Sequence, residues 1–132
     1  MSIRSQLEAI AKKRMQDVSE IARVSIIRVG NRVITASPVD KGSFRNQWNT
    51  SINSISYDTS KPDSKGGADS INELASEISD LNLGATAYFT NPMPYGPRLE
   101  YDGWSEQAPN GMLRVNTDLW EMIVNQEVEK RK

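Results

Sequence analysis

The sequence of 132 residues contains no cysteine and no histidine. Without cysteine the chain cannot form a disulfide, a thiolate zinc site or a cysteine nucleophile, and its redox compartment stays undetermined. Without histidine it lacks the most common metal ligand and the usual general base of catalytic triads. These two absences exclude the most frequent kinds of catalytic and metal centre.

Long apolar runs and a strong charge imbalance are also missing. The chain has 16 Lys and Arg residues against 17 Asp and Glu, whereas a dedicated nucleic-acid-binding domain usually has a pI above about 9. No run approaches the roughly 18 apolar residues of a membrane span, and the amino-terminal segment has no apolar signal core. The simplest interpretation is a soluble intracellular protein with one domain over residues 1–132, since compact domains usually contain about 100–150 residues.

The amino-terminal quarter predicts one long helix, with Ser2 as its N-cap. Apart from the adjacent pairs 10–11 and 21–22, its apolar residues follow one another at gaps of three, four or seven, as on one helix face. They are Ile3, Leu7, Ile10, Ala11, Met15, Val18, Ile21, Ala22, Val29 and Val33. Uninterrupted to about residue 34, the helix would be roughly 48 Å long, although Gly30 and Asn31 also permit an earlier end or a kink. Its first half either lies along the sheet of its own chain, the simpler interpretation, or packs against another chain.

Charge is distributed unevenly along the chain. Through Arg32 there are seven Lys or Arg residues against three acids, a net charge of +4, whereas residues 58–80 contain six acids against two bases, a net charge of −4. At 100° per residue the cations scatter around the helix, which favours a solvated face over a partner contact. If the helix does contact a partner, Arg14, Arg28 and Arg32 are the candidate residues.

The following segments predict a small sheet. Residues 48–57 and 84–90 have strand character, the first with a break because its apolar residues do not alternate strictly. Between them, residues 58–70 form a polar loop that we expect to be flexible. Ser70 then caps a short helix, because apolar residues follow it at helical spacing.

The remaining segments complete the expected fold. Residues 95–101 predict a helical turn, and a final helix is expected to start at residues 109–111. The sequence therefore predicts an α+β domain. A long amino-terminal helix packs on a small, mostly antiparallel sheet, accompanied by a short middle helix and a carboxy-terminal helix.

The acidic and aromatic residues offer candidate sites of different kinds. Glu100, Asp102 and Glu106 are close enough in sequence for a carboxylate pair, but acids in one short loop are usually solvated, so we expect no catalytic, cofactor or metal site. Aromatic residues in irregular segments either cover a core or anchor an interface. We expect Trp48 and Tyr101 in the core and leave both alternatives open for Trp104. Tyr95, Trp104 and Glu106 are the candidate interface residues of this region.

Two separated segments have a particular composition. Residues 37–48 (SPVDKGSFRNQW) combine a proline turn and a glycine with an aromatic-flanked strand start, and residues 91–112 (NPMPYGPRLEYDGWSEQAPNGM) precede the last helix. Their distinctive residues are Pro38, Val39, Asp40, Gly42, Phe44, Arg45 and Trp48, then Asn91, Pro94, Tyr95, Leu99, Glu100, Tyr101, Gln107, Ala108, Pro109, Gly111 and Met112. In this order after a long helix, they resemble the tail-component family of long-tailed phages. That family comprises minor tail, tail-completion and head–tail joining proteins of the lambda Z-like kind.

The resemblance implies a structural protein of the virion neck or the head-proximal tail end, present in the host cytoplasm during assembly. Similar proteins form rings, commonly hexamers, between the head connector and the tail terminator or tail tube. Double-stranded DNA passes through the lumen as cargo, and neither an enzyme activity nor a membrane is involved.

A ring implies unlike contacting surfaces on each subunit, because cyclic symmetry places one patch against a different patch of the next subunit. We expect the acidic residues 58–80 of one copy to face the basic helix of another. The alternative function is a small nucleic-acid-binding module that uses the basic amino-terminal helix. An enzyme that uses the acids near Glu100 is a third possibility.

Overall fold

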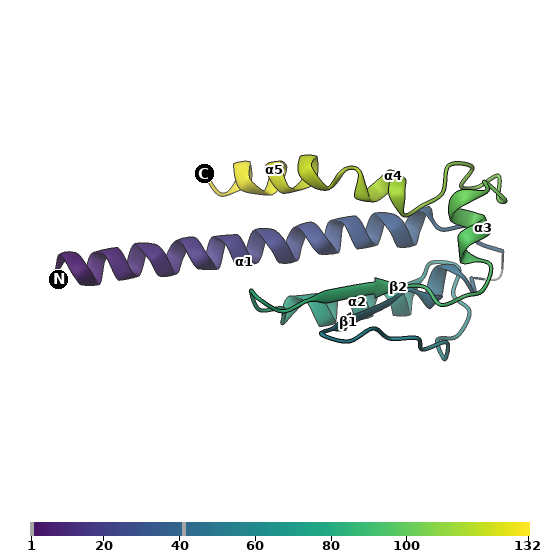
Figure 1. Cartoon of the computed structure of the whole chain (residues 1–132), viewed down its shortest axis with the longest axis horizontal. Helices are drawn as coiled ribbons and strands as arrows, with labels where there is room; N and C mark the ends of the chain where they lie inside the picture. Colours follow the sequence, from purple (N-terminus) through teal and green to yellow (C-terminus); the bar gives the residue numbers. More distant parts are fainter. Residues whose placement is uncertain (1, 41) are drawn as a thin grey trace.

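The computed structural model of the chain describes residues 2–40 and 42–132. Its dominant element is α1, which runs over Ile3–Ala36 without a break (Figure 1). Ser2 is the N-cap, as predicted, and its Oγ accepts a hydrogen bond from the N–H of Ser5. The helix ends before Pro38, whose ring cannot continue the helical hydrogen bonds.

Within the described residues, seven shorter elements follow α1. They are η1 (Arg45–Gln47), β1 (Asn49–Ile52), α2 (Ala68–Ser79), β2 (Ala87–Thr90), α3 (Gly96–Tyr101), α4 (Arg114–Thr117) and α5 (Trp120–Lys130). The two strands form an antiparallel sheet with Asn49 opposite Thr90 and Ile52 opposite Ala87. The predicted α+β class is confirmed, and so is the helical turn at residues 95–101.

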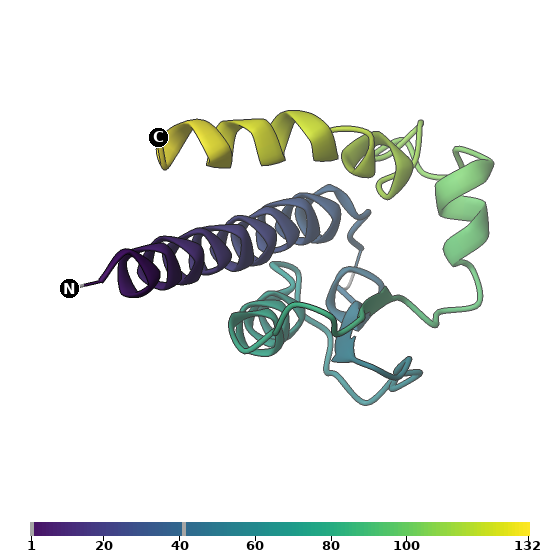
Figure 2. The same ribbon diagram turned by 60° about the vertical axis from the view of Figure 1, so that its left-hand side comes forward.

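The carboxy-terminal half of α1 lies in the middle of the molecule (Figures 1 and 2). α5 runs antiparallel to it on one side, α2 packs against it on the other, and β1 packs on α2. Gly30 lies where α2 approaches α1 closely, and a Cβ at this position would lie 2.5 Å from Leu74 Cδ2, so the Leu74 side chain would have to shift. This glycine therefore serves helix packing and does not end or kink α1.

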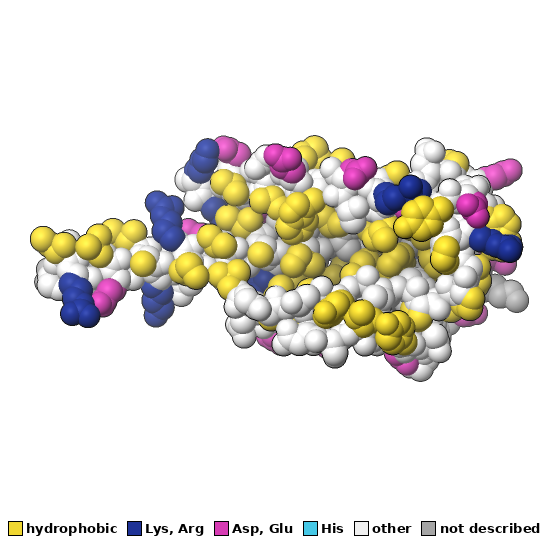
Figure 3. Space-filling model, viewed as in Figure 1, with side chains coloured by type: hydrophobic (Ala, Val, Ile, Leu, Met, Phe, Trp, Pro, Cys, Tyr) yellow, Lys and Arg dark blue, Asp and Glu magenta, His cyan; other side chains and the backbone are white. Residues whose placement is uncertain are grey.

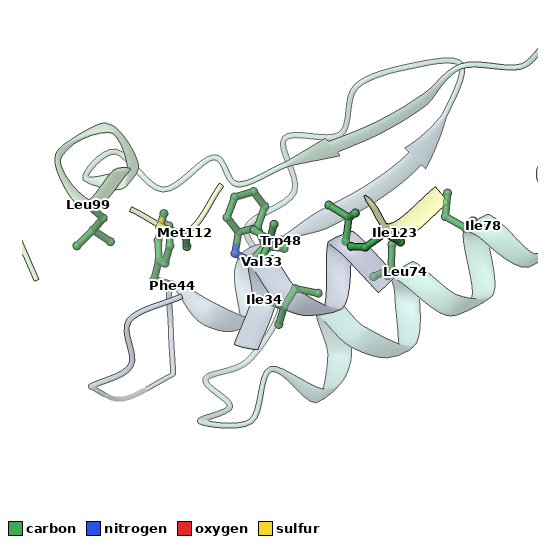
Figure 4. Packing of buried hydrophobic residues seen from close by; sticks show 10 residues of the cluster. Val33, Ile34, Phe44, Trp48, Leu74, Ile78, Leu99, Met112 and Ile123 are labelled. Carbon is green, nitrogen blue, oxygen red and sulfur yellow. The ribbon is translucent and has the colours of Figure 1, made fainter. Parts of the chain in front are cut away.

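The hydrophobic core lies where this half of α1 meets α2, the sheet, α3 and α5 (Figure 4). Trp48 is buried and stacks on Phe89 with ring centroids 4.7 Å apart, and Phe44 contacts Trp48 edge-on at 5.9 Å. The prediction that Trp48 belongs to the core is confirmed. The other buried members of the cluster are Val29, Val33, Ile34, Leu74, Ile78, Leu99, Met112 and Ile123.

The amino-terminal half of α1 projects beyond this core, with residues 2–16 all exposed. The expectation that this half lies along the sheet of its own chain is wrong, because the sheet lies beside the other half (Figure 1). The projecting helix contains many polar residues and is therefore much less apolar than a membrane span. Within residues 2–40 and 42–132, no helix combines the length and apolar character of a membrane span.

Helix α2 starts differently from its prediction. Its N-cap is Gly67, with φ +71°, and Ser70 lies buried inside the helix rather than capping it. Asn46 takes over the capping role from a distance, because its Oδ1 accepts the N–H of Ser70 at 3.0 Å. An unpaired N–H of the first helical turn is thereby satisfied by a residue outside the helix.

The boundaries of other predicted elements also differ from those in the structure. The strand expected over residues 48–57 ends at Ile52, since Asn53 adopts a φ of +66°. Residues 53–57 are not part of a strand. The final helix does not start at residues 109–111. Its first helical residue is Arg114, and α4 and α5 are separate helices.

The polar loop at residues 58–70 lies against η1 and β1. Three amide side chains donate hydrogen bonds to backbone carbonyls of the loop: Asn46 to Pro62 (2.7 Å), Gln47 to Lys61 (2.6 Å) and Asn49 to Asp58 (2.8 Å). Asn46 also donates to the carboxylate of Asp69 at 2.7 Å. The loop is irregular but fastened at several points, and its expected flexibility stays a prediction.

Candidate interaction surfaces

The two distinctive sequence segments meet at the end of the molecule opposite the projecting helix (Figure 1). The Gln107 side chain donates to the carbonyl of Val39 and accepts from its N–H, both at 2.8 Å, although 68 positions separate the two residues. Asn91 Nδ2 donates to the carbonyl of Phe44 at 2.9 Å. These bonds join residues 37–48 to residues 91–112.

Arg45 and Gly42 hold the first segment in its turn. The Arg45 guanidinium donates to the carbonyl of Ser37 through Nε (3.0 Å) and Nη2 (2.8 Å), and to that of Lys65 through Nη1 (2.8 Å). Gly42 has a φ of +90°, and a Cβ there would lie 2.2 Å from the backbone of Ser64. Both residues therefore fix the turn after α1 to the polar loop, which is a structural role.

Glu100 is buried and its carboxylate caps the start of α4. Oε1 accepts the N–H groups of Met112 (2.9 Å) and Leu113 (2.7 Å), while Oε2 accepts the N–H (3.0 Å) and Nε (2.8 Å) of Arg114. Burial alone would raise the pKa of Glu100, but the Arg114 side chain and these N–H groups together hold that pKa below its ordinary value. The geometry gives Glu100 the role of a fixed structural anion.

An aromatic pocket of about 440 Å³ opens beside the two segments, lined by Asp40, Phe44, Tyr95 and Trp104 among others. The Tyr95 ring lies 5.7 Å from Phe44 and 6.5 Å from Trp104, centroid to centroid. Burial, and then the charge of Asp63, raise the pKa of Tyr95, so its phenol stays a hydrogen-bond donor at neutral pH. The pocket thus combines aromatic surface with a donor and the carboxylate of exposed Asp40.

Two aromatic residues beside this pocket, Tyr101 and Trp104, are exposed, although Tyr101 was expected in the core. Tyr101 is 65% exposed, so its placement in the core is wrong; the Arg114 guanidinium covers its ring at 4.5 Å. Trp104 is 61% exposed with Arg98 5.7 Å from its ring centroid, which favours the interface alternative. Of the other candidates, Pro94, Glu106 and Pro109 are also exposed.

The three candidate cations of α1 have different surroundings. Arg28 Nη1 lies 2.8 Å from Glu127 Oε2, and Arg32 Nε donates to Asn116 Oδ1 at 3.1 Å, so both bind helices of their own chain. Arg14 is exposed on the projecting half of α1. Arg14 is therefore the member of the set best placed to contact a partner.

Sequence reasoning did not identify Glu127, which holds α5 on α1. Its buried carboxylate pairs with Arg28, with Lys130 (2.9 Å) and with Arg131 (3.1 Å). The hydrogen bond from Lys130, followed by those from Arg131 and Arg28, outweighs burial and lowers the pKa of Glu127 to about 2. One signal was present in the sequence: Glu127 follows buried Ile123 by four positions, which places it on the same helix face.

The projecting half of α1, residues 3–18, carries exposed apolar side chains. We call them the projecting stripe: Ile3, Leu7, Ile10, Met15 and Val18, whose exposed fractions lie between 51% and 76%. Their spacing places them toward one side of the helix, and Figure 3 shows apolar side chains along this part of the molecule. Apolar patches of this kind mark interaction surfaces when they are contiguous.

A second apolar surface lies between the α4–α5 segment and the sheet, where Figure 3 shows apolar side chains around a hollow. This β2 groove has a volume of about 330 Å³. Its floor includes Ile26 and Val29 of α1, and its walls include Phe89 of β2 and Trp120 of α5. Trp120 remains 42% exposed, so the groove is open to a partner.

Comparisons of the chain with protein-family models, with curated proteins and with solved structures found no match. What the protein does is therefore inferred from its own residues and surfaces.

Proposed function

We propose that the protein is a structural component of the phage neck or of the head-proximal tail end. Copies of it would form a ring, commonly a hexamer in similar proteins, between the head connector and the tail terminator or tail tube, with DNA passing through the lumen. The proposal rests on the resemblance of residues 37–48 and 91–112 to the tail-component family. The structural observation that carries it is the projecting half of α1 with its exposed apolar stripe.

The projecting half supports an assembly role because its own chain does not cover it. Helices in proteins derive most of their stability from packing an apolar face, and burying one Leu or Ile side chain contributes about 1.5–3 kcal/mol. The side chains of the projecting stripe lack most of that contribution in a single chain, because they are exposed. A neighbouring subunit that covers the stripe would recover it and would stabilise the fold by mass action.

The two ends of the molecule expose unlike surfaces, which suits a head-to-tail assembly. One end presents the projecting stripe, and the other presents Trp104 beside the aromatic pocket. Contacts between unlike patches generate closed rings when the rotation between subunits closes. Exposed aromatic residues such as Trp104 are typical anchors of protein interfaces.

The nucleic-acid alternative receives less support from the surface of α1. Arg4 pairs with Glu8 and Lys13 with Asp17 along the helix, both at 3.1 Å. Local pairing reduces the positive potential that phosphate binding requires. A salt-dependent gel shift with duplex DNA separates the two functions, since the assembly role predicts no shift above background.

The test of the proposed function begins with the mass of the protein in solution, measured by light scattering over a concentration series. A discrete closed oligomer is expected, and a Leu7→Asp variant with a charge in the stripe should stay monomeric. For a chain that assembles only on its template, co-sedimentation with purified tails or connectors is the second measurement. A wild-type chain that is monomeric throughout and does not co-sediment contradicts the proposal.

A further inference from the structure

The projecting stripe and the β2 groove are complementary surfaces that a single chain cannot bring together, because both belong to the same straight helix α1. We propose that the projecting half of α1 from one copy docks into the β2 groove of a second copy. This inference rests on the proposed ring assembly and identifies the surfaces through which neighbouring subunits meet.

Continuity of the apolar face is the first argument. The stripe ends at Val18, and the same side of α1 continues through Ala22 to Ile26 and Val29, which form the floor of the groove. Apolar surface therefore extends from the projecting half into the groove of the same subunit. A second helix lying along this surface would bury the stripe of one copy and the open groove of the other.

The groove is shorter than the projecting half. Residues 3–18 span about 24 Å at the rise of an α-helix. The α4–α5 segment lines the groove through Leu113, Thr117 and Trp120, which together span about 11 Å when helical. The groove can therefore hold about two turns of the projecting half.

Charge complementarity is the second argument. The projecting half contains Arg4, Lys12, Lys13 and Arg14 against Glu8 and Asp17, and its net charge is +2 with the pairs Arg4–Glu8 and Lys13–Asp17 included. Exposed Asp118 and Glu121 each follow a residue that lines the groove, Thr117 and Trp120, and line the adjoining surface of the α4–α5 segment. The basic helix would therefore lie beside an acidic edge of the groove.

The same charges disfavour a symmetric pairing of two projecting halves. Such a pair would bring two helices with an excess of positive charge together, and like charges across an interface oppose association. It would also leave the β2 groove and Trp120 exposed. A second copy that docks head to tail accounts for both surfaces.

Disulfide trapping tests the contact directly, because the chain has no native cysteine. One preparation carries Leu7→Cys in the stripe and another carries Thr117→Cys, a residue that lines the groove. Both positions are exposed, so both chains should fold, which circular dichroism checks. The two are mixed at equal concentration, oxidised, and separated on a non-reducing gel. The control replaces Thr117→Cys by Ser60→Cys, in the exposed polar loop.

The proposal predicts a mixed disulfide between the Leu7→Cys and Thr117→Cys chains. Its yield should exceed that of the Ser60→Cys control about 10-fold or more, because docking raises the effective concentration of the two thiols. Predominant homodimers of Leu7→Cys would instead show a symmetric helix pair. A mixed yield equal to the control, with wild-type rings seen by light scattering, overturns this contact and leaves the assembly role standing. If wild-type protein also neither oligomerises nor co-sediments, both fail.

Discussion

Two glycines with positive φ have different surroundings. Gly111 has a φ of +85°, and a Cβ there would lie 2.6 Å from the carbonyl oxygen of Glu100 and 2.8 Å from its carboxylate. Gly84 has a φ of +95°, but a Cβ there would meet nothing within 4 Å. An alanine at Gly84 therefore tests only the energetic cost of a left-handed backbone, whereas an alanine at Gly111 also disturbs the cap of α4.

We expect Gly84→Ala to lower the free energy of unfolding by about 1 kcal/mol, the cost of an alanine in the left-handed region. Gly111→Ala should lower it by about 3 kcal/mol, because the new Cβ also displaces the Glu100 carboxylate from the N–H groups that it accepts. Urea unfolding of the two variants beside the wild type measures both values. Equal losses would mean that the contact between Gly111 and Glu100 contributes nothing.

Glu127 makes the free energy of unfolding depend on pH in the acidic range. Its pKa is about 2 in the folded chain against an ordinary value of 4.5. The unfolded state therefore binds the proton more readily, and the carboxylate contributes stability that is complete above about pH 4.5 and is lost as the pH falls toward 2. The hydrogen bonds of the Glu127 carboxylate with Lys130, and then with Arg131 and Arg28, are the physical source of this dependence.

Glu127→Gln should make the free energy of unfolding less dependent on pH between about 2 and 5, since the variant has no proton to bind at this position. At neutral pH it should also be less stable by about 2 kcal/mol, because hydrogen bonds to a charged group are lost. Some acid dependence should remain, because the pKa of Glu100 is lowered as well. An unchanged pH dependence in urea unfolding from pH 2 to 7 would contradict this account of Glu127.

Residue roles were predictable from the sequence only where local spacing determines them. Trp48 lies in the core, as predicted, one residue before β1 begins, and the helix-face position of Glu127 is visible in its spacing from Ile123. Tyr101 was misplaced because α3 is a short helix that turns Leu99 inward and leaves Tyr101, two positions later, outward. Nothing in the sequence shows where α3 packs.

At the scale of elements, α1 has two halves with different roles. Leu7 and Ile10 in the first half are 60% and 57% exposed, whereas Ile34 in the second is fully buried. All three are large aliphatic residues on one continuous helix. Replacing these side chains by alanine therefore compares the contribution of an exposed surface with that of a core surface in the same helix.

We expect the double substitution Leu7→Ala and Ile10→Ala to change the free energy of unfolding of the monomer by no more than about 0.5 kcal/mol. Ile34→Ala should cost about 2–5 kcal/mol, because it leaves a cavity in the core. Urea unfolding at low concentration, where oligomers are absent, measures both. A large loss in the double variant would mean that the projecting half contributes to the fold of its own chain.

Element starts were less predictable than element types. The periodic apolar pattern of α1 was enough to predict its type and length within a few residues. The starts of α2 and α4 were missed because their caps come from remote residues: Asn46 binds the N–H of Ser70, and Glu100 binds the N–H groups before α4. A cap supplied by a distant part of the chain leaves no local signal beside the helix.

For the whole molecule, the proposed contact joins two exposed apolar surfaces of different copies. One is the projecting stripe, and the other is the β2 groove with Trp120 in its wall. A substitution that damages one surface leaves the other intact in the same chain. Head-to-tail docking therefore allows complementation between two defective chains, which symmetric pairing of the stripes does not.

We expect Leu7→Asp and Trp120→Asp chains each to remain monomeric, because a buried unpaired carboxylate opposes docking. An equal mixture should form a 1:1 dimer: the intact stripe of the Trp120→Asp chain docks into the intact groove of the Leu7→Asp chain. Growth stops there, since the two remaining surfaces both carry a new carboxylate. Light scattering of each chain and of the mixture measures this. A mixture that stays monomeric while the wild type assembles would show that stripe and groove are not partners.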